Sequence, residues 1–326
     1  MTETTKQIMV TGAAGQIGCE LVKSLRRKHG SERVLATDIQ SPSDPSILHS
    51  GPFEYCDVTD RGRIEDLARG YGIDTIYHMA AILSASGEKK PNLAWEVNVN
   101  GTYNVLEAAR ARKIGRVFIP SSIAAFGPET PRDNTPQETI LRPRTMYGVT
   151  KVAGELLGDY YVRRFAMDVR GCRFPGVISH EVLPSGGTTD YAVAIFYEAV
   201  KNGKYTCFLK EDARLPMMYM PDCLKAAEDL MEADLSSLEH HCDFNISAMS
   251  FTPAELAEEI RKHVPEFTCE YKPDFRQAIA ETWPKSVDDS AARKEWGWKP
   301  DYDLAAMTGD MIRVLSLRHA QGELNY

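Results

Sequence analysis

Short apolar runs alternate with amphipathic stretches along the first half of the chain. The run at 7–11 leads into a glycine-rich turn, and residues 19–29 then place their apolar side chains on one face of a helix. A longer helix is predicted at 93–112. Further apolar runs of strand length stand at 33–38, 53–58, 75–78, 116–120 and 169–174. This alternation predicts an α/β fold with a doubly wound parallel sheet.

The turn after the first strand has the spacing of a dinucleotide-binding fingerprint. Gly12, Gly15 and Gly18 stand three residues apart, with Gln16 and Ile17 at the start of the following helix. Glycines permit a tight turn and close approach of the backbone to a pyrophosphate, whose charge is stabilised at a helix amino terminus. An ordinary glycine-rich turn is the alternative, but the flanking strand and helix favour a Rossmann-type nucleotide site.

Two carboxylates follow strands at the same predicted edge. Asp38 ends the second strand, 20 residues beyond Gly18, where a carboxylate accepts from the ribose hydroxyls and repels a 2′-phosphate. NAD is therefore favoured over NADP, although a strand-end Asp can also simply open a turn. Asp57, with Val58 beside it, ends the third strand and is a candidate partner for the adenine amino group. A helix cap for the segment beginning near Asp60 is the competing interpretation.

Tyr147 and Lys151 are candidates for acid–base chemistry. They stand four residues apart on a predicted helix, so both side chains can reach one point. An ammonium favours the phenolate, which turns a weak acid into a base near neutral pH. An exposed helical pair is the plainer alternative. Ser122, delivered to the same edge by the fifth strand, strengthens the catalytic interpretation.

The first 176 residues resemble the extended short-chain dehydrogenase/reductase superfamily, on the glycine fingerprint, the acidic second-strand end, the serine and Tyr-x-x-x-Lys. The resemblance implies that Ser122 hydrogen-bonds the reacting oxygen, Tyr147 exchanges its proton, and Lys151 holds the nicotinamide ribose. His78 is expected to pack rather than to react. With the fingerprint and both carboxylates, the expected contacts of NAD also include His78, Ala80, Ala81, Asn98, Tyr147, Lys151 and Pro175.

Across nearly its whole length, the chain is similar to the short-chain-type, metal-free L-threonine 3-dehydrogenases. The shared stretches include Gly-Gly-Thr-Thr-Asp-Tyr-Ala at 186–192 and the segments 120–127, 214–222 and 282–290. Ser122 stands where many members carry Thr, and Ser185 where a third Gly is common. The family implies oxidation of L-threonine at C3 and a homodimer paired through the Asn98 and Tyr147 helices. The implied substrate contacts are Ser84, Ser122, Ile123, Tyr147, Gly187, Thr188, Thr189 and Trp283.

Two other functions remain open from the sequence. An NDP-sugar epimerase or dehydratase is favoured by Arg214, because related enzymes place an Arg near this position on a diphosphate. Residues 123–125 are apolar, however, whereas dehydratases tend to carry acidic groups directly after the catalytic serine. A non-catalytic NAD sensor of the same fold would need the dinucleotide site but not the acid–base pair.

Composition bounds the remaining possibilities. The 326 residues carry a formal net charge of −8, which argues against a nucleic-acid or anionic-membrane surface. Seven scattered cysteines and the absence of an apolar leader predict reduced thiols and a cytoplasmic protein. No metal is expected, since His240-His241-Cys242 has no further ligands at metal-site spacing and is interpreted as a surface turn. We expect an NAD-binding domain at 1–176 and an intimately joined, smaller α/β substrate lobe at 177–326.

Overall fold

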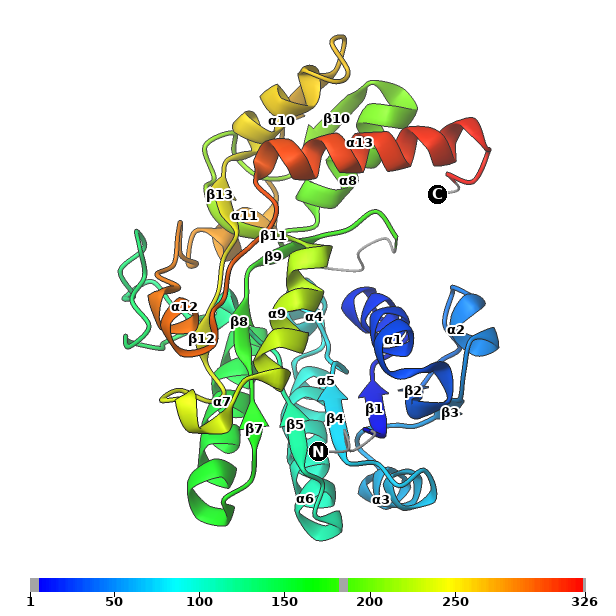
Figure 1. The fold of residues 1–326 in the computed structure, drawn as a ribbon. Helices are drawn as coiled ribbons and strands as arrows, with labels where there is room; N and C mark the ends of the chain where they lie inside the picture. Colours follow the sequence, from blue (N-terminus) through cyan, green and yellow to red (C-terminus); the bar gives the residue numbers. More distant parts are fainter. Residues whose placement is uncertain (1–5, 182–186, 325–326) are drawn as a thin grey trace.

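The computed structural model describes residues 6–181 and 187–324, and it has the predicted α/β architecture (Figure 1). In these segments the central sheet has six strands, all parallel. Their spatial order is β3 (Phe53–Tyr55), β2 (Val34–Asp38), β1 (Ile8–Thr11), β4 (Thr75–His78), β5 (Arg116–Phe118) and β7 (Val169–Arg170). The doubly wound fold predicted from the sequence is confirmed.

Side-chain alternation along the strands builds a hydrophobic core on each face of this sheet. Ile8 and Val10 of β1 join one core, whereas Met9 between them joins the other. The first face is covered by α1 (Gln16–His29) and α9 (Met220–Glu232), which contact each other. The second face is covered by α3 (Arg61–Gly70), α6 (Gly101–Arg112) and α7 (Met146–Phe165).

The long helix predicted at 93–112 is interrupted. The chain forms α5 (Pro91–Trp95), then a π-helical stretch at Glu96–Asn100, and then α6. Asn98 lies in this stretch, and its amide group bonds both the N–H and the carbonyl of Ile82. A π-bulge inserts one residue into the helical ladder and is frequent at functional sites. The interruption thus turns Asn98 toward the loop after β4.

The predicted strand at 169–174 is also divided, into β7 and β8 (Cys172–Phe174). Gly171 between them bonds the carbonyl of His241, and a Cβ there would lie 2.2 Å from the carbonyl oxygen of Ile119. The chain therefore leaves the central sheet, and β8 pairs with β6 (Ser121–Ser122) and β12 (Phe244–Asn245). This small sheet includes Ser122, which follows β5 closely along the chain.

The rest of the carboxyl half forms the upper part of Figure 1, around α8 (Tyr191–Asn202), α10 (Pro253–Arg261) and α13 (Leu304–Ala320). The chain after residue 176 is not confined there, because α9 and β12 pack on the first core of the central sheet. The boundary near 176 stays a prediction. The remaining elements are α2 (Ser46–His49), α4 (Ser84–Lys89), β9 (Gly176–Ile178), β10 (Lys204–Cys207), β11 (Leu215–Tyr219), β13 (Met249–Phe251), β14 (Thr268–Tyr271), α11 (Phe275–Ala280) and α12 (Ser290–Trp296).

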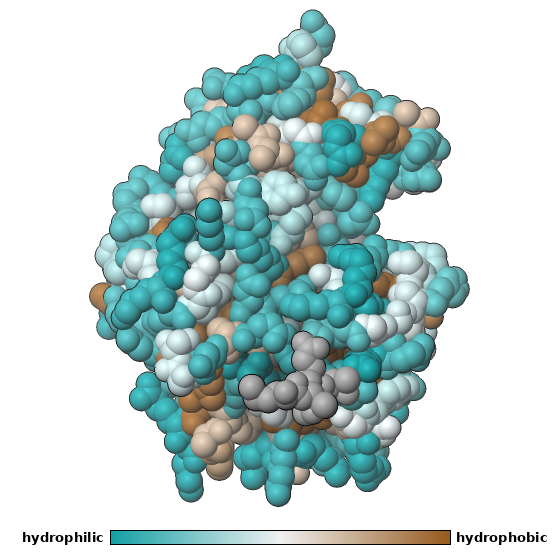
Figure 2. Space-filling view, viewed as in Figure 1, coloured by the Kyte–Doolittle hydropathy of each residue, from teal (hydrophilic) through white to brown (hydrophobic). Residues whose placement is uncertain are grey.

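The face shown in Figure 2 is mostly hydrophilic, with apolar areas small and scattered. Its outline is hollowed on the right, between the part that carries α13 and the part that carries α1 and α2. Trp298 is buried and Trp296 packs against it in the core, as the sequence predicted. Among residues 6–181 and 187–324 we find no helix with the length and apolar character needed to cross a bilayer.

Candidate active site

A cleft of about 570 Å³ runs along the carboxyl edge of the central sheet. Parallel strands end at one edge of a sheet, so side chains that follow different strands meet there. The cleft collects both carboxylates, the catalytic candidates and the predicted substrate contacts. The predicted residues that line it are Gly12, Gly15, Gln16, Ile17, Gly18, Asp38, Asp57, Val58, Ala80, Ala81, Ser84, Ser122, Ile123, Tyr147, Lys151, Pro175, Gly187, Thr188, Thr189 and Trp283.

The glycine turn fits a dinucleotide. Gly12 has φ +68°, and a Cβ there would lie 2.5 Å from the backbone nitrogen of Ala80. The first turn of α1 carries no acidic residue, and Gly15 offers it no side-chain cap. The Nε2 of Gln16 is buried and has no hydrogen-bond partner among the described residues. Uncapped N–H groups and an orphaned amide donor are what a pyrophosphate would satisfy.

Asp38 closes the other end of this cradle. Its carboxylate accepts from the backbone N–H of Ala14 at 2.9 Å and of Gln40 at 3.2 Å, and it lines the cleft. Among the described residues, Lys151 is the one basic side chain that lines the cleft. A bound 2′-phosphate would require an Arg or Lys near Asp38, and none of the described residues that line the cleft there is one.

Asp38→Asn is expected to raise the ratio of NADP to NAD efficiency (kcat/KM) by about tenfold or more, because it removes the charge that repels a 2′-phosphate. The amide oxygen of Asn can still accept from the backbone, so the turn should persist. Steady-state kinetics with both cofactors measures the ratio. Asp57→Asn is the matched control, since Asp57 lines the same cleft, and an equal change in that variant would contradict the assignment.

Asp57 follows β3, which is shorter than predicted. Its Oδ1 accepts from both the backbone N–H and the hydroxyl of Thr59, at 2.9 and 2.8 Å. The cap of α3 is Asp60, whose side chain accepts from the N–H of Arg63. The segment therefore has its helix cap at Asp60, and Asp57 remains at the cleft.

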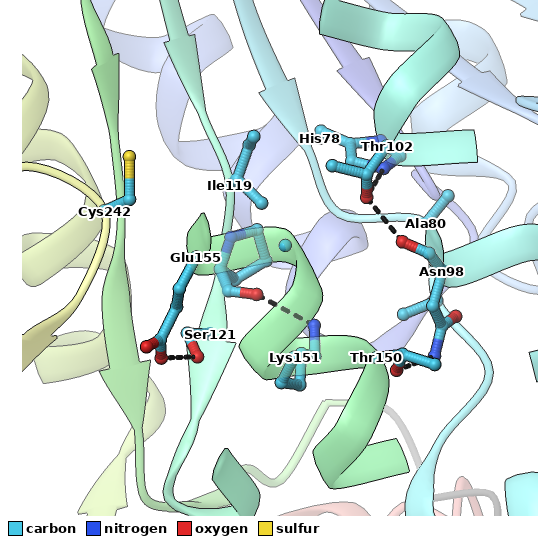
Figure 3. Close-up of a pocket in the computed structure, with 13 residues that line it drawn as sticks. His78, Ala80, Asn98, Thr102, Ile119, Ser121, Thr150, Lys151, Glu155 and Cys242 are labelled. Carbon is cyan, nitrogen blue, oxygen red and sulfur yellow. Dashed lines mark hydrogen bonds between the residues drawn. The ribbon is translucent and has the colours of Figure 1, made fainter. Parts of the chain in front are cut away.

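His78 and Asn98 do not line the cleft. Both line a small cavity of about 10 Å³ behind it (Figure 3). His78 bonds the hydroxyls of Thr11 and Thr102 at 2.8 and 3.2 Å, and complete burial lowers its pKa to about 3. His78 is thus a packed, neutral side chain, as the sequence predicted. Asn98 instead fixes the backbone at Ile82 and bonds Thr150 on α7.

The three catalytic candidates meet where β6 faces the first turns of α7. Tyr147 forms a hydrogen bond with Ser122. Burial raises the pKa of Tyr147 to about 12, although the hydrogen bond with Ser122 acts to lower it. The Nζ of Lys151 donates to the carbonyl of Pro120 at 2.8 Å and lies 5.4 Å from the centre of the Tyr147 ring. Burial lowers the pKa of Lys151 to about 8. Desolvation thus acts on both groups against the ion pair that the sequence suggested.

The predicted substrate contacts converge from three segments. Ser84, at the start of α4, has its hydroxyl 3.2 Å from that of Thr188 and accepts from the Thr188 N–H at 3.3 Å. Trp283 is buried, and its carbonyl accepts from the Nε of Arg132 at 3.0 Å. Gly187 donates to Asp190 at 2.7 Å. Ser185 and Gly186 of the predicted loop lie outside the described residues.

Some lining residues were not predicted. Ile39 and Gln40 follow Asp38, and Cys56 and Thr59 flank Asp57 and Val58. These four could have been predicted from their position next to predicted cofactor contacts. The others are Met79, Ile82, Leu83, Leu93, Glu96, Val97, Pro120, Ser121, Phe174, Gly176, Val177 and Asp190.

Within the described segments, no three His, Cys, Asp or Glu residues come together in a way that would hold a metal ion. His240 instead bonds Glu295 at 2.6 Å and Glu138 at 3.2 Å. Cys242 is buried and His240 is only partly exposed, so the prediction of a surface turn is wrong for Cys242.

The sequence profile of the NAD dependent epimerase/dehydratase family matches residues 8–247. The chain belongs to this family. It is an NAD-dependent oxidoreductase or epimerase that acts on a small molecule, and NAD is its cofactor. An uncharacterized epimerase/dehydratase of Staphylococcus aureus strain USA300 is 52% identical over 311 residues, covering 95% of this chain and 97% of that protein.

Two solved structures are similar over nearly the whole chain. The crystal structure of L-threonine dehydrogenase from Phytophthora infestans is 54% identical with a TM-score of 0.92, covering 96% of this chain and 100% of that one. A monomeric L-threonine 3-dehydrogenase from a metagenome is 49% identical with a TM-score of 0.92, covering 95% and 99%. The resemblance seen in the sequence is confirmed.

Proposed function

We propose that this family member oxidises L-threonine at C3 with NAD, giving 2-amino-3-oxobutanoate and NADH. The observation that carries the proposal is the composition of the cleft beyond Tyr147. The hydroxyls of Ser84 and Thr188 offer small, neutral hydrogen-bond partners, as a compact amino acid requires. The similar solved structures named as threonine dehydrogenases support it.

The chemistry follows from the placement of three side chains. NAD supplies the hydride acceptor and, in its oxidised form, a positive ring charge. Ser122 orients the substrate hydroxyl, and Tyr147 as phenolate takes its proton while the hydride leaves C3. Lys151 adds positive charge near the phenol, and the role proposed for its ammonium is to hold the nicotinamide ribose.

Among the described residues that line the cleft there is no Arg that could bind the diphosphate of a sugar nucleotide. Arg214, which favoured it in the sequence, pairs with Glu255 and donates to the carbonyl of Ser250 at 2.8 Å. It does not line the cleft. Ile123, buried directly after the catalytic serine, cannot transfer protons for a dehydratase.

The test is to incubate the purified protein with NAD and L-threonine, without added metal, and to follow NADH absorbance. Formation of NADH supports the proposal. Its absence despite demonstrable NAD binding would reject threonine and direct the search to sugar nucleotides. Binding of NAD without turnover of either class would favour the sensor.

Catalytic efficiency is expected to rise toward alkaline pH. Burial raises the pKa of Tyr147, so the phenolate fraction grows with pH over the neutral range. We expect kcat/KM for threonine to increase by roughly tenfold per pH unit between about pH 7 and 8, before other ionisations intervene. A profile at saturating NAD that stayed flat would contradict Tyr147 as base.

We further propose a homodimer paired through α5, α6 and α7. Exposed apolar side chains gather on these helices, where Trp95 is 45%, Tyr103 46%, Leu156 65% and Tyr160 53% exposed. Light scattering of the wild-type protein should give twice the mass of one chain. The double variant Leu156→Glu with Tyr160→Glu should give the mass of a single chain. A monomeric wild type, as one relative is named, would reject the dimer.

We propose a cytoplasmic location, supported by seven unpaired cysteines.

A further inference from the structure

A stripe on α7 holds the segment that carries the catalytic serine. Tyr147, Lys151 and Glu155 stand at successive i, i+4 positions and so share one face of the helix. Each of them bonds a different residue of the segment 120–122. The pairs are Tyr147 with the Ser122 hydroxyl, Lys151 with the Pro120 carbonyl, and Glu155 with the Ser121 hydroxyl, which donates to it. The first two residues of the stripe belong to the catalytic set, and the third has no assigned role.

Glu155 is held as a buried carboxylate. It is 6% exposed, and Arg173 on β8 is 2% exposed. The guanidinium of Arg173 donates from Nε to Oε1 at 2.9 Å and from Nη2 to Oε2 at 2.8 Å. A bidentate pair with a third donor from Ser121 fixes both the charge and the orientation of the carboxylate. Burying such a charge is costly, so it needs a reason beyond packing.

Glu155 and Lys151 line the same small cavity behind the active site, as Figure 3 shows. The other titratable groups that line it do not oppose or replace this charge. His78 on β4 is neutral because burial lowers its pKa, and the Cys242 thiol is neutral because burial raises its pKa. Arg173 pairs with Glu155 but does not line the cavity, and the Arg173 guanidinium also lies 3.5 Å from Asp243. Among the described residues of this cavity, Glu155 is the one carboxylate.

We propose that Glu155 is a positioning residue for the catalytic pair: its carboxylate keeps the Lys151 side chain an ammonium and anchors Ser121, the residue before Ser122. The proposal rests on the proposed function, since it assigns Glu155 a task through Lys151 and Ser122. Burial lowers the pKa of Lys151, and the charge of Glu155 acts in the opposite direction. Without Glu155 the amine would lose its proton more readily, and the phenolate would lose the positive charge of the one basic side chain among the described residues of the cleft.

Glu155→Gln tests the proposal, because Gln is nearly isosteric and can still accept from Ser121. The readout is the titration of the Lys151 side chain by NMR in protein carrying ¹³C at lysine Cε, with the resonance assigned by Lys151→Arg. We expect its midpoint to fall by about one pH unit or more. We also expect the rising limb of the kcat/KM profile to move to higher pH. A purely structural Glu155 would change unfolding without moving either midpoint.

Two further variants keep the test decisive. Glu107→Gln breaks another glutamate–arginine pair, Glu107 with Arg110 on α6, which does not line the cavity, and should leave the Lys151 midpoint unchanged. If Glu155→Gln folds poorly because Arg173 is left unpaired, the double variant Glu155→Gln with Arg173→Gln removes both charges and should still lower the midpoint.

An unchanged Lys151 midpoint in a folded Glu155 variant would overturn the proposal. The titration uses no substrate, so its failure is distinct from failure of the threonine assay. If wild-type protein forms no NADH while the midpoint moves as expected, the proposed substrate is wrong and the electrostatic role of Glu155 stands.

Discussion

Replacing Tyr147 with Phe is expected to lower threonine turnover by about a thousandfold while NAD still binds. The substitution removes one hydroxyl, the group that bonds Ser122, and leaves the ring that packs beside Lys151. No other phenol lines the described part of the cleft, so no side chain there can take over as base. Turnover is measured from NADH absorbance, and binding from calorimetric titration with NAD.

Tyr161→Phe is the matched control for this prediction. Tyr161 lies on the same helix, is buried, and donates to Glu107 at 2.7 Å, but it does not line the cleft. Its loss should cost about 1 kcal/mol of unfolding free energy and little turnover. A Tyr147→Phe enzyme that kept more than about a tenth of wild-type turnover would remove Tyr147 from its assigned role.

The positions of the cofactor and catalytic residues were predictable because they depend on local order along the chain. Asp38 and Ser122 each follow an apolar run, and parallel strands carry such residues to one edge whatever the details of packing. Tyr147 and Lys151 share a helix face by spacing alone. These four residues reach the cleft as predicted.

Contacts between distant segments were not predictable in the same way. Arg132 lies in a Pro-rich loop that gives no strand signal, yet its carbonyl accepts from the N–H of Lys285 at 2.7 Å and its Nε bonds the carbonyl of Trp283. The pairing of Glu155 with Arg173 joins a helix to a strand 18 residues away. Neither contact can be recognised in the sequence, because Arg and Glu residues are common and most of them lie on the surface.

Burial also changes the electrostatics that spacing suggested. A Tyr and a Lys one turn apart suggest an ion pair that stabilises the phenolate, but desolvation raises the pKa of Tyr147 and lowers that of Lys151. The protein's own groups therefore keep the phenol protonated near neutral pH. Positive charge from the oxidised nicotinamide, together with a Lys151 kept charged by Glu155, is what would shift the balance toward the base.

Gly12→Ala is expected to weaken NAD binding by about a hundredfold and to destabilise the protein by at least about 2 kcal/mol. The φ of +68° strains any residue with a Cβ, and this Cβ would also lie 2.5 Å from the backbone nitrogen of Ala80 and 2.7 Å from the carbonyl carbon of Met79. Relief requires the glycine turn to move away from the end of β4. That movement would displace the start of α1 from the position in which its N–H groups face a pyrophosphate. Chemical denaturation and calorimetric titration with NAD measure the two effects.

Gly72→Ala separates strain from collision. Gly72 has φ +62°, nearly the same as Gly12, but a Cβ there would meet nothing within 4 Å, and it lies outside the cleft. It should therefore lose about 1–2 kcal/mol of stability and no NAD affinity. If both variants lost the same stability and neither lost affinity, the close approach of Gly12 to β4 would not matter for the cofactor. If only Gly12→Ala lost affinity, the contact between the turn and the end of β4 would be what sets the pyrophosphate site, and conformational freedom alone would not explain the glycine.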